Sequence, residues 1–178
     1  MAKILFVCTG NVFRSMSAEL ALKSADEEGR HTFSSAGTHA ILTQPVRAET
    51  QERLKSWGAD SSGHKPRLLT ADMIKEADLV VAMGTDHRDF IEKTFGVRPV
   101  LFMKVAQGME QGIPDLNEAI PDYRENREGS KLYIHGVVDL IFGNQEEFME
   151  RLPQFLKIAP APKLAAKPPN GRPPSFRM

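Results

Sequence analysis

The stretch FVCTGNVFRS (residues 6–15) joins an apolar run to a helical pattern, and it decides how the fold begins. The apolar run, residues 4–7, is continuous, which is typical of a strand buried on both faces of a parallel sheet. After the stretch, apolar residues such as Met16 and Leu20 recur at helical spacing until Gly29, a plausible stop. The stretch is therefore predicted to be the turn from a first strand into a first helix.

Strand-like and helix-like segments alternate along most of the chain. A short strand is expected around residues 32–35, and the apolar runs DLVVAM and RPVLFM (residues 78–83 and 98–103) predict two more. Helices are expected from Pro45 to Gly58, near residues 71–76, from Thr85 or Asp86 to Gly96, and from Leu132 to about residue 157, with possible breaks at Gly143-Asn144 and Pro153. Because parallel strands need crossover connections, we predict a three-layer, doubly wound α/β sheet of about four parallel strands, with helices on both faces.

Two segments fall outside this alternation. After Met103 comes a loop of roughly 25 residues, longer than the usual limit of about 12 to 15, and loops of this length are often functional. From residue 158 onward the chain is rich in Pro and Ala with scattered basic charges, a composition that cannot build a core. We therefore predict one domain over residues 1–157 and a basic, disordered tail over residues 158–178.

The composition restricts the classes of partner. The 23 basic and 23 acidic side chains cancel, so no net field favours nucleic acid or an anionic membrane. No apolar run reaches the roughly 18 residues of a membrane span, and the first residues are too short an apolar stretch for a signal peptide. A single cysteine in 178 residues excludes an internal disulfide, and a lone thiol suits a reducing compartment. We expect a soluble cytoplasmic protein, and its oligomeric state stays open.

The strand-to-helix turn is suited to binding phosphate. Helix N-termini present unpaired N–H groups and the positive end of the helix dipole. Gly10 and Asn11 tolerate backbone conformations that turn successive N–H groups inward, and Arg14 adds a planar fork for two oxygens. The predicted phosphate-binding residues are Thr9, Gly10, Asn11, Val12, Phe13 and Arg14.

The same environment favours the thiolate of Cys8, which is the nucleophilic form. A cysteine at the end of a buried strand is usually there for packing. However, a given cysteine has on the order of a 1 in 100 chance of an arginine six positions on followed by Ser or Thr. We therefore expect Cys8 to attack phosphorus and form a phosphocysteine that water releases, with Arg14 and the loop holding the equatorial oxygens and Ser15 donating a hydrogen bond to the sulfur.

These motifs resemble the low-molecular-weight protein tyrosine phosphatases, whose mark is C-x5-R-[ST] directly after the first strand. The resemblance extends over about residues 3–157 and includes SSAGTH (34–39), SGHKPRLLT (62–70), ADLVVAM (77–83) and an acid-bearing segment near IPDY (120–123). It implies that Cys8 is the nucleophile and Arg14 the phosphate clamp. It also implies that Asn11, Ser35 and His64 belong to a polar network that supports the loop.

The leaving oxygen needs a proton, and a carboxylic acid is the usual donor. Members of the family take it from an Asp in a D-P-Y segment on the long loop. The candidates are Asp115 in GIPDL and Asp122 in AIPDY, and we select Asp122 because Tyr123 and the distance to the last helix match better. The Pro that the family has between this Asp and the Tyr is absent.

Other departures bear on regulation and specificity. Phe13 replaces a second cysteine that can protect the nucleophile in many members, which excludes that route of oxidative regulation. Gly84 replaces a common Asp. The aromatic pocket wall of many members corresponds to Ile41 or Leu42. Val12 is at a position that is aliphatic in tyrosine-specific members and Thr in related arginine phosphatases, which favours tyrosine.

The resemblance predicts a protein-tyrosine phosphatase that acts on a phosphorylated protein or a small aryl phosphate. Arsenate reduction with an external thiol is an alternative, because arsenate mimics phosphate. A phosphate-binding or phosphoprotein-binding module with an impaired acid loop is another. The five histidines are scattered, so we expect no metal site, and without a Walker or dinucleotide motif we expect no cofactor.

Overall fold

The computed structural model describes residues 1–158. Its strands are β1 (Ala2–Cys8), β2 (His31–Gly37), β3 (Leu79–Ala82) and β4 (Val100–Leu101). Its helices are α1 (Arg14–Ala25), α2 (Ala48–Ser56), α3 (Ala71–Glu76), α4 (Thr85–Phe95), α5 (Phe102–Gln107), α6 (Leu116–Ala119), α7 (Arg127–Gly143) and α8 (Gln145–Ile158). The predicted tail lies outside the described residues, apart from Ile158, the last residue of α8.

The four strands form one parallel sheet in the order β2-β1-β3-β4. The chain leaves β1 toward β2 on one side and then crosses to β3 on the other, so the strand order reverses at β1. In open sheets of this kind, ligands bind outside the carboxyl ends of the strands at the point of reversal. The turn that follows Cys8 begins at this point.

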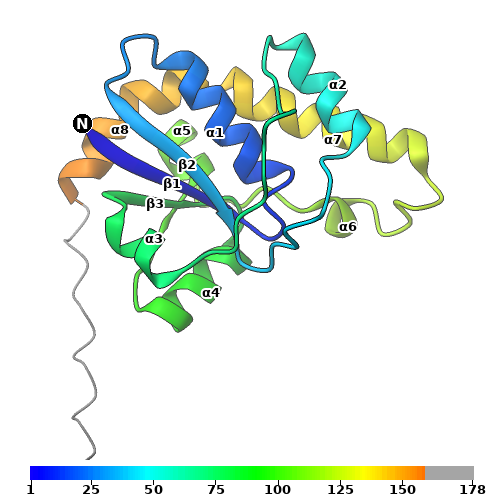
Figure 1. Ribbon diagram of the computed structural model, residues 1–178. Helices are drawn as coiled ribbons and strands as arrows, with labels where there is room; N and C mark the ends of the chain where they lie inside the picture. The colour runs from blue at the N-terminus through cyan, green and yellow to red at the C-terminus, as the bar shows by residue number, and fades with distance from the viewer. Residues whose placement is uncertain (159–178) are drawn as a thin grey trace, which may run out of the picture.

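Helices cover both faces of the sheet (Figure 1). Along β1, the side chains of Ile4, Phe6 and Cys8 pack in the core with α1, α5, α7 and α8. Those of Leu5 and Val7 face the smaller core under α3 and α4. The alternation follows from the strand period of two, and it confirms the three-layer architecture with a first strand buried on both faces.

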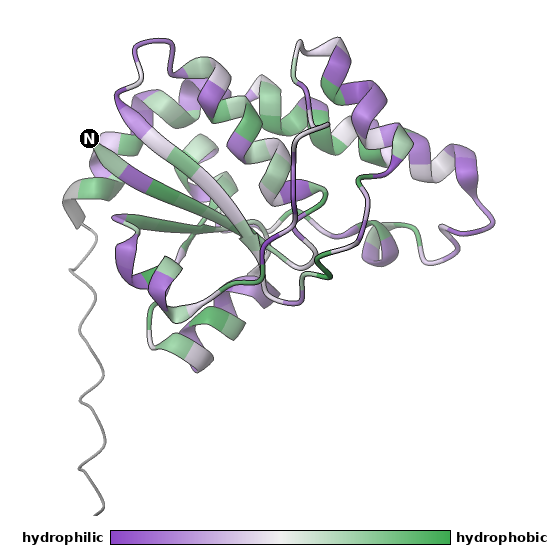
Figure 2. Ribbon diagram, in the orientation of Figure 1, coloured by the Kyte–Doolittle hydropathy of each residue, from purple (hydrophilic) through white to green (hydrophobic). Residues whose placement is uncertain are grey.

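The hydropathy of the helices follows their position in the layers. In Figure 2 β1 and β3 are largely hydrophobic and β2 is of intermediate hydropathy, whereas α2, which packs on α7, is mainly hydrophilic. The helix α1 is enclosed between β2, α7 and α8, and it is buried mostly through small residues, among them Ser17, Ala18 and Ala21. Small side chains let α1 approach the sheet closely, which brings its first turn next to the end of β1.

The structure differs from the sequence-based expectations at several places. The strand expected over residues 98–103 is limited to β4, because Phe102 and Met103 belong to α5. The long helix expected near the C-terminus begins earlier, at Arg127; it breaks at Asn144, one of the two predicted positions, while Pro153 stays inside α8. The long loop after β4 is not structureless, because it contains α5, ended by Gly108 at φ 77°, and the short α6. Among the helices of residues 1–158, none combines the length and apolar character that crossing a bilayer requires.

Candidate active site

The turn between β1 and α1 curls around an open centre. Asn11 has φ 59°, the only positive φ outside glycine among the described residues, as expected of a residue that tolerates the left-handed region. None of the backbone N–H groups of residues 9–13 donates to a protein acceptor within residues 1–158. At Gly37, which ends β2, a Cβ would lie 2.4 Å from the carbonyl oxygen of Thr9 and 3.0 Å from the amide nitrogen of Asn11. The glycine therefore lets β2 support the turn directly.

Cys8 lies at the base of this turn with its sulfur against a serine hydroxyl. The distance from Cys8 Sγ to Ser15 Oγ is 2.9 Å. Asn11 Nδ2 donates to the same hydroxyl at 3.0 Å, and the other possible acceptor for the Ser15 proton, the carbonyl of Ala36, is 3.4 Å away. The Ser15 hydroxyl therefore lies within hydrogen-bonding distance of both the sulfur and the carbonyl oxygen of Ala36, and Asn11 fixes its position.

A polar network fixes Asn11. Its side-chain Nδ2 also donates to Ser35 Oγ at 2.8 Å, and its backbone carbonyl oxygen is 2.6 Å from His64 Nε2. The structure thus brings together the three residues of the predicted network. Sequence reasoning missed two further members: Arg67, whose backbone N–H donates to Asn11 Oδ1 at 2.9 Å, and Glu19, whose carboxylate accepts from the Ser35 hydroxyl. Arg67 lies within the segment SGHKPRLLT (62–70), and the only sequence signal of Glu19 is its spacing of four from Ser15.

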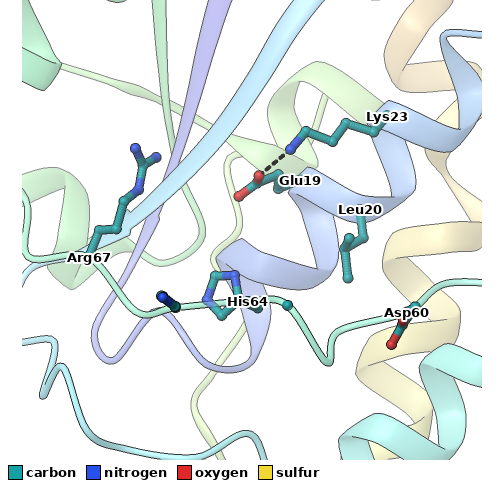
Figure 3. Close-up of a pocket in the computed structure, with 8 residues that line it drawn as sticks. Glu19, Leu20, Lys23, Asp60, His64 and Arg67 are labelled. Atoms are coloured by element: carbon teal, nitrogen blue, oxygen red, sulfur yellow. Dashed lines mark hydrogen bonds and ion pairs between the residues drawn. The ribbon is translucent and has the colours of Figure 1, made fainter.

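The outer side of this network borders a second cavity of about 290 Å³. Figure 3 shows His64 on the loop segment below helix α1, and the side chains of Glu19 and Lys23 joined by an ion pair on that helix. Arg67 lies on the same loop segment as His64, and its guanidinium donates to the carbonyl of Ser35 at 2.7 and 3.1 Å. This cavity is behind the turn, and Cys8 does not line it.

Arg14 is the largest fully buried polar side chain of the site, with 2% of its surface exposed. Its Nη1 donates to the carbonyl oxygen of Ile113 at 2.8 Å, and its Nη2 is 3.2 Å from Asp115 Oδ2. Its Nε is buried and has no hydrogen-bond partner within the described residues. A buried charged donor without a partner is costly unless a ligand satisfies it, so this atom points to an anionic ligand.

The two acid candidates lie in different places. Asp115 lines the cavity that contains Cys8 and Arg14, and it caps α6 by accepting from the N–H of Leu116 at 2.8 Å. Its loop is held by the Tyr133 hydroxyl, which donates to the carbonyl of Pro114 at 2.5 Å. Asp122 is exposed in the turn before α7 and does not line the cavity. The structure therefore brings Asp115, and not the selected Asp122, to the nucleophile.

The contacts of Tyr123 explain why its neighbour Asp122 lies outside the cavity. The guanidinium groups of Arg47 and Arg124 lie over the Tyr123 ring, 5.4 and 5.6 Å from the ring centroid. Tyr123 makes cation–π contacts with these arginines, of which Arg47 lines the cavity. Its neighbour Asp122 stays outside the cavity. The segment IPDY (120–123) thus resembles the family's acid segment in sequence, whereas the Asp of GIPDL, Asp115, is the one that lines the cavity with Cys8.

The catalytic cavity has a volume of about 290 Å³. Its floor is formed by Cys8, Thr9, Gly10, Val12, Phe13 and Arg14. Ile41 lines its wall, as the aliphatic exchange predicted, whereas Leu42 is 66% exposed and does not line it. Sequence analysis missed the remaining lining residues, which are His39, Gln44, Arg47, Leu116 and Ile134. Within residues 1–158, no group of three or more His, Cys, Asp or Glu side chains is arranged to hold a metal ion.

The turn, the buried arginine and the thiol define a cysteine-based phosphate site on a doubly wound sheet. Comparison with known families agrees: residues 3–154 match the model of the low molecular weight phosphotyrosine protein phosphatases. The chain therefore belongs to this family, and the resemblance read from its motifs is confirmed.

Relatives and solved structures cover most of the chain. The low molecular weight protein-tyrosine-phosphatase Etp of Escherichia coli K12 is 30% identical over 140 residues, 76% of this chain and 86% of the relative. PtpB of Staphylococcus aureus, with the same description, is 28% identical over 78% of this chain and 91% of its own. A structure of YwlE arginine phosphatase with a phosphorylated active-site serine has a TM-score of 0.71 and 27% identity, covering 85% of this chain and 96% of its own.

Proposed function

We propose that the protein hydrolyses phosphomonoesters, with phosphotyrosine in proteins as the substrate, through a phosphocysteine on Cys8. The observation that carries the proposal is the set of donors around the thiol. The N–H groups of residues 9–13 and the buried Nε of Arg14 lack protein acceptors within the described residues, and they surround the one cysteine. Such a cradle suits the three equatorial oxygens of a phosphoryl group in transfer.

In the first step, the Cys8 thiolate attacks phosphorus and the bond from phosphorus to the ester oxygen breaks. Ser15 supports the sulfur through the 2.9 Å contact. Arg14 and the loop N–H groups are held in place before the substrate arrives, so they stabilise the developing charge without reorganisation. The polar network around Asn11 maintains this geometry.

We propose Asp115, in place of Asp122, as the acid that protonates the leaving oxygen. Its Oδ2 is 3.2 Å from Arg14 Nη2, so the carboxyl lies beside the group that binds the phosphate. In the second step the resulting carboxylate takes a proton from water, which attacks phosphorus, breaks the bond to sulfur and releases inorganic phosphate and the thiolate.

The test of this assignment is a matched pair of variants. Asp115→Asn should lower kcat for phosphotyrosine by about 100-fold or more, because the leaving phenoxide loses its proton donor. The loss should be smaller for an aryl phosphate with a good leaving group, which needs the proton less. Asp122→Asn, the control, should stay within a factor of about two of the wild type. Equal effects of the two variants, or an unchanged Asp115→Asn, would exclude Asp115 as the acid.

The alternatives have less support. Family membership does not favour arsenate reduction, and the described residues contain no further cysteine to relay oxidation. A binding module with an impaired acid loop is disfavoured because Asp115 is in the cavity. An arginine phosphatase is among the structural relatives, so phosphoarginine is the substrate to compare with phosphotyrosine. Val12, which lines the cavity, supports phosphotyrosine, and an excess of phosphoarginine turnover would reverse that choice.

A further inference from the structure

A buried histidine lies beneath the phosphate-binding turn and has no part in the steps above. His87, in the first turn of α4, is 1% exposed. Its Nδ1 accepts the backbone N–H of Gly84 at 3.0 Å. A ring nitrogen that accepts a hydrogen bond carries no proton, so His87 is neutral and its proton is on Nε2.

The Nε2–H of His87 is directed at the residue after the nucleophile. Its distance to Thr9 Oγ1 is 2.8 Å, and that to Asp86 Oδ2, the other acceptor near it, is 3.3 Å. Because Nε2 donates, the Thr9 hydroxyl must accept, and its own proton is left for a different partner. Thr9 lines the catalytic cavity with Cys8 and Arg14.

The neutral form of His87 is stable across the physiological range. Burial, together with the nearby Arg14 guanidinium, lowers the pKa of His87 from 6.5 to about 4. The carboxylates of Asp86 and Asp115 oppose this shift, while His39 adds to it. The direction of the hydrogen bond to Thr9 therefore does not reverse at neutral pH.

Gly84, which replaces a common Asp, leaves space for this arrangement. A Cβ at Gly84 would lie 2.5 Å from Asp86 Oδ1 and 3.1 Å from His87 Nδ1. The loop that carries Asp115 also packs here, since a Cβ at Gly112 would lie 3.0 Å from the Cα of Gly84. A side chain at position 84 would therefore displace the Asp86 carboxylate and press on the histidine ring.

We propose that His87 is a positioning residue that makes the Thr9 hydroxyl a hydrogen-bond donor to the phosphoryl group in the cavity. The proposal rests on the proposed function, because it adds one side-chain donor to the backbone donors of the turn. It predicts that a chain without the hydroxyl, or without its orientation, binds phosphate more weakly. A hydrogen bond to a charged group contributes about 1.5 to 3 kcal/mol, which corresponds to about tenfold or more in the inhibition constant of inorganic phosphate.

The test is a double-mutant cycle on the full chain, read as the inhibition constant of inorganic phosphate and as kcat/KM for an aryl phosphate. His87→Asn keeps an acceptor for Gly84 but is too short to reach Thr9, and Thr9→Val removes the hydroxyl. Each should weaken phosphate binding about tenfold, and the double variant should be no worse than Thr9→Val alone. His31→Asn, on a residue outside the catalytic cavity, is the control.

Additive losses, or a Thr9→Val variant with the wild-type inhibition constant, would overturn the proposal. If circular dichroism shows that His87→Asn is unfolded, two variants of Thr9 still test the proposal. Thr9→Ser, which keeps the hydroxyl, should retain phosphate binding, and Thr9→Val should not. A wild-type protein that hydrolyses no phosphomonoester would instead defeat the proposed function. A wild type that does, with unchanged Thr9 variants, would defeat this inference alone.

Discussion

Arg14 and Asp115 show how single residues of this site depend on each other. The guanidinium is buried, and two of its three nitrogens contact the loop that carries the acid, at Ile113 and Asp115. The third, Nε, is the one without a partner in the described residues. Arg14 therefore both binds phosphate and places the acid, so substitution of Arg14 should affect more than affinity.

The pKa of His87 gives a prediction for stability. The unfolded chain takes up a proton on this residue as the pH falls below 6.5, whereas the folded chain does so only near pH 4. Stability should therefore fall with pH across this window, by about 3 kcal/mol in total. Urea unfolding at pH 7 and at pH 4 measures the loss, and His87→Asn should show a loss smaller by about that amount. An equal loss in both proteins would contradict the account.

At this scale, sequence reasoning identified the nucleophile, the arginine and the turn, because these are local in the chain. It selected Asp122, whereas the structure places Asp115 in the cavity, because that placement depends on contacts between distant segments. The hydroxyl of Tyr133 on α7 and the guanidinium of Arg14 hold the Asp115 loop. Neither contact leaves a periodic or motif signal near residue 115.

Among the elements, the connection from α1 to β2 depends on one side chain. The Asp26 carboxylate accepts the backbone N–H groups of Arg30 at 3.0 Å and His31 at 2.8 Å. Burial alone raises the pKa of Asp26, but these two hydrogen bonds with the charges of His31 and Arg30 more than offset it, so the pKa is lowered. The carboxylate thus holds β2 in register beside β1 while the turn after β1 rests on Gly37.

Asp26→Ala should lower the free energy of unfolding by about 2 kcal/mol, because two backbone donors lose their acceptor. Catalytic constants should stay near those of the wild type, since Asp26 is outside the cavity. Glu28→Ala is the control, because Glu28 is 76% exposed and its ion pair with Arg30 contributes little. Denaturant unfolding measures both variants, and equal stabilities would show that the carboxylate does not fix the connection.

The elements themselves were largely predictable from apolar runs and helix-ending glycines. The strands β1 and β3 and the helix stop at Gly96, which has φ 70°, follow the sequence pattern directly. The short helices α5 and α6 were not predicted, since each is too short to show a period. Tertiary contacts decide them: α5 packs on α8, and α6 on α7.

For the whole molecule, the position of the site follows from topology. The order β2-β1-β3-β4 places the turn after β1 at the reversal of the sheet, and the loops after β2 and β4 add Ile41 and Asp115 to the cavity. A ligand in this cavity would join the turn after β1, the loop after β2, the Asp115 loop and α7. Binding should therefore stabilise the fold as a unit.

Inorganic phosphate at about 100 times its dissociation constant should stabilise the protein by about 2.7 kcal/mol. For a chain of this size, that corresponds to a rise in Tm of roughly 5 to 10 °C. Calorimetry measures the rise against sodium chloride of equal ionic strength. Arg14→Lys, which keeps the charge but loses the planar fork, should show most of the rise removed. A full rise in this variant would mean that phosphate binds elsewhere.

The central claim is that phosphate passes through Cys8, and its most direct test is to trap the intermediate. The protein is mixed with an aryl phosphate under reducing conditions, quenched during turnover and digested, and the peptide carrying Cys8 is measured by mass spectrometry. The account predicts a phosphoryl group on the sulfur of Cys8 in the wild type, and loss of turnover in Cys8→Ala. Hydrolysis that continues in Cys8→Ala, or a quenched wild type with steady turnover and no phosphate on Cys8, would contradict it.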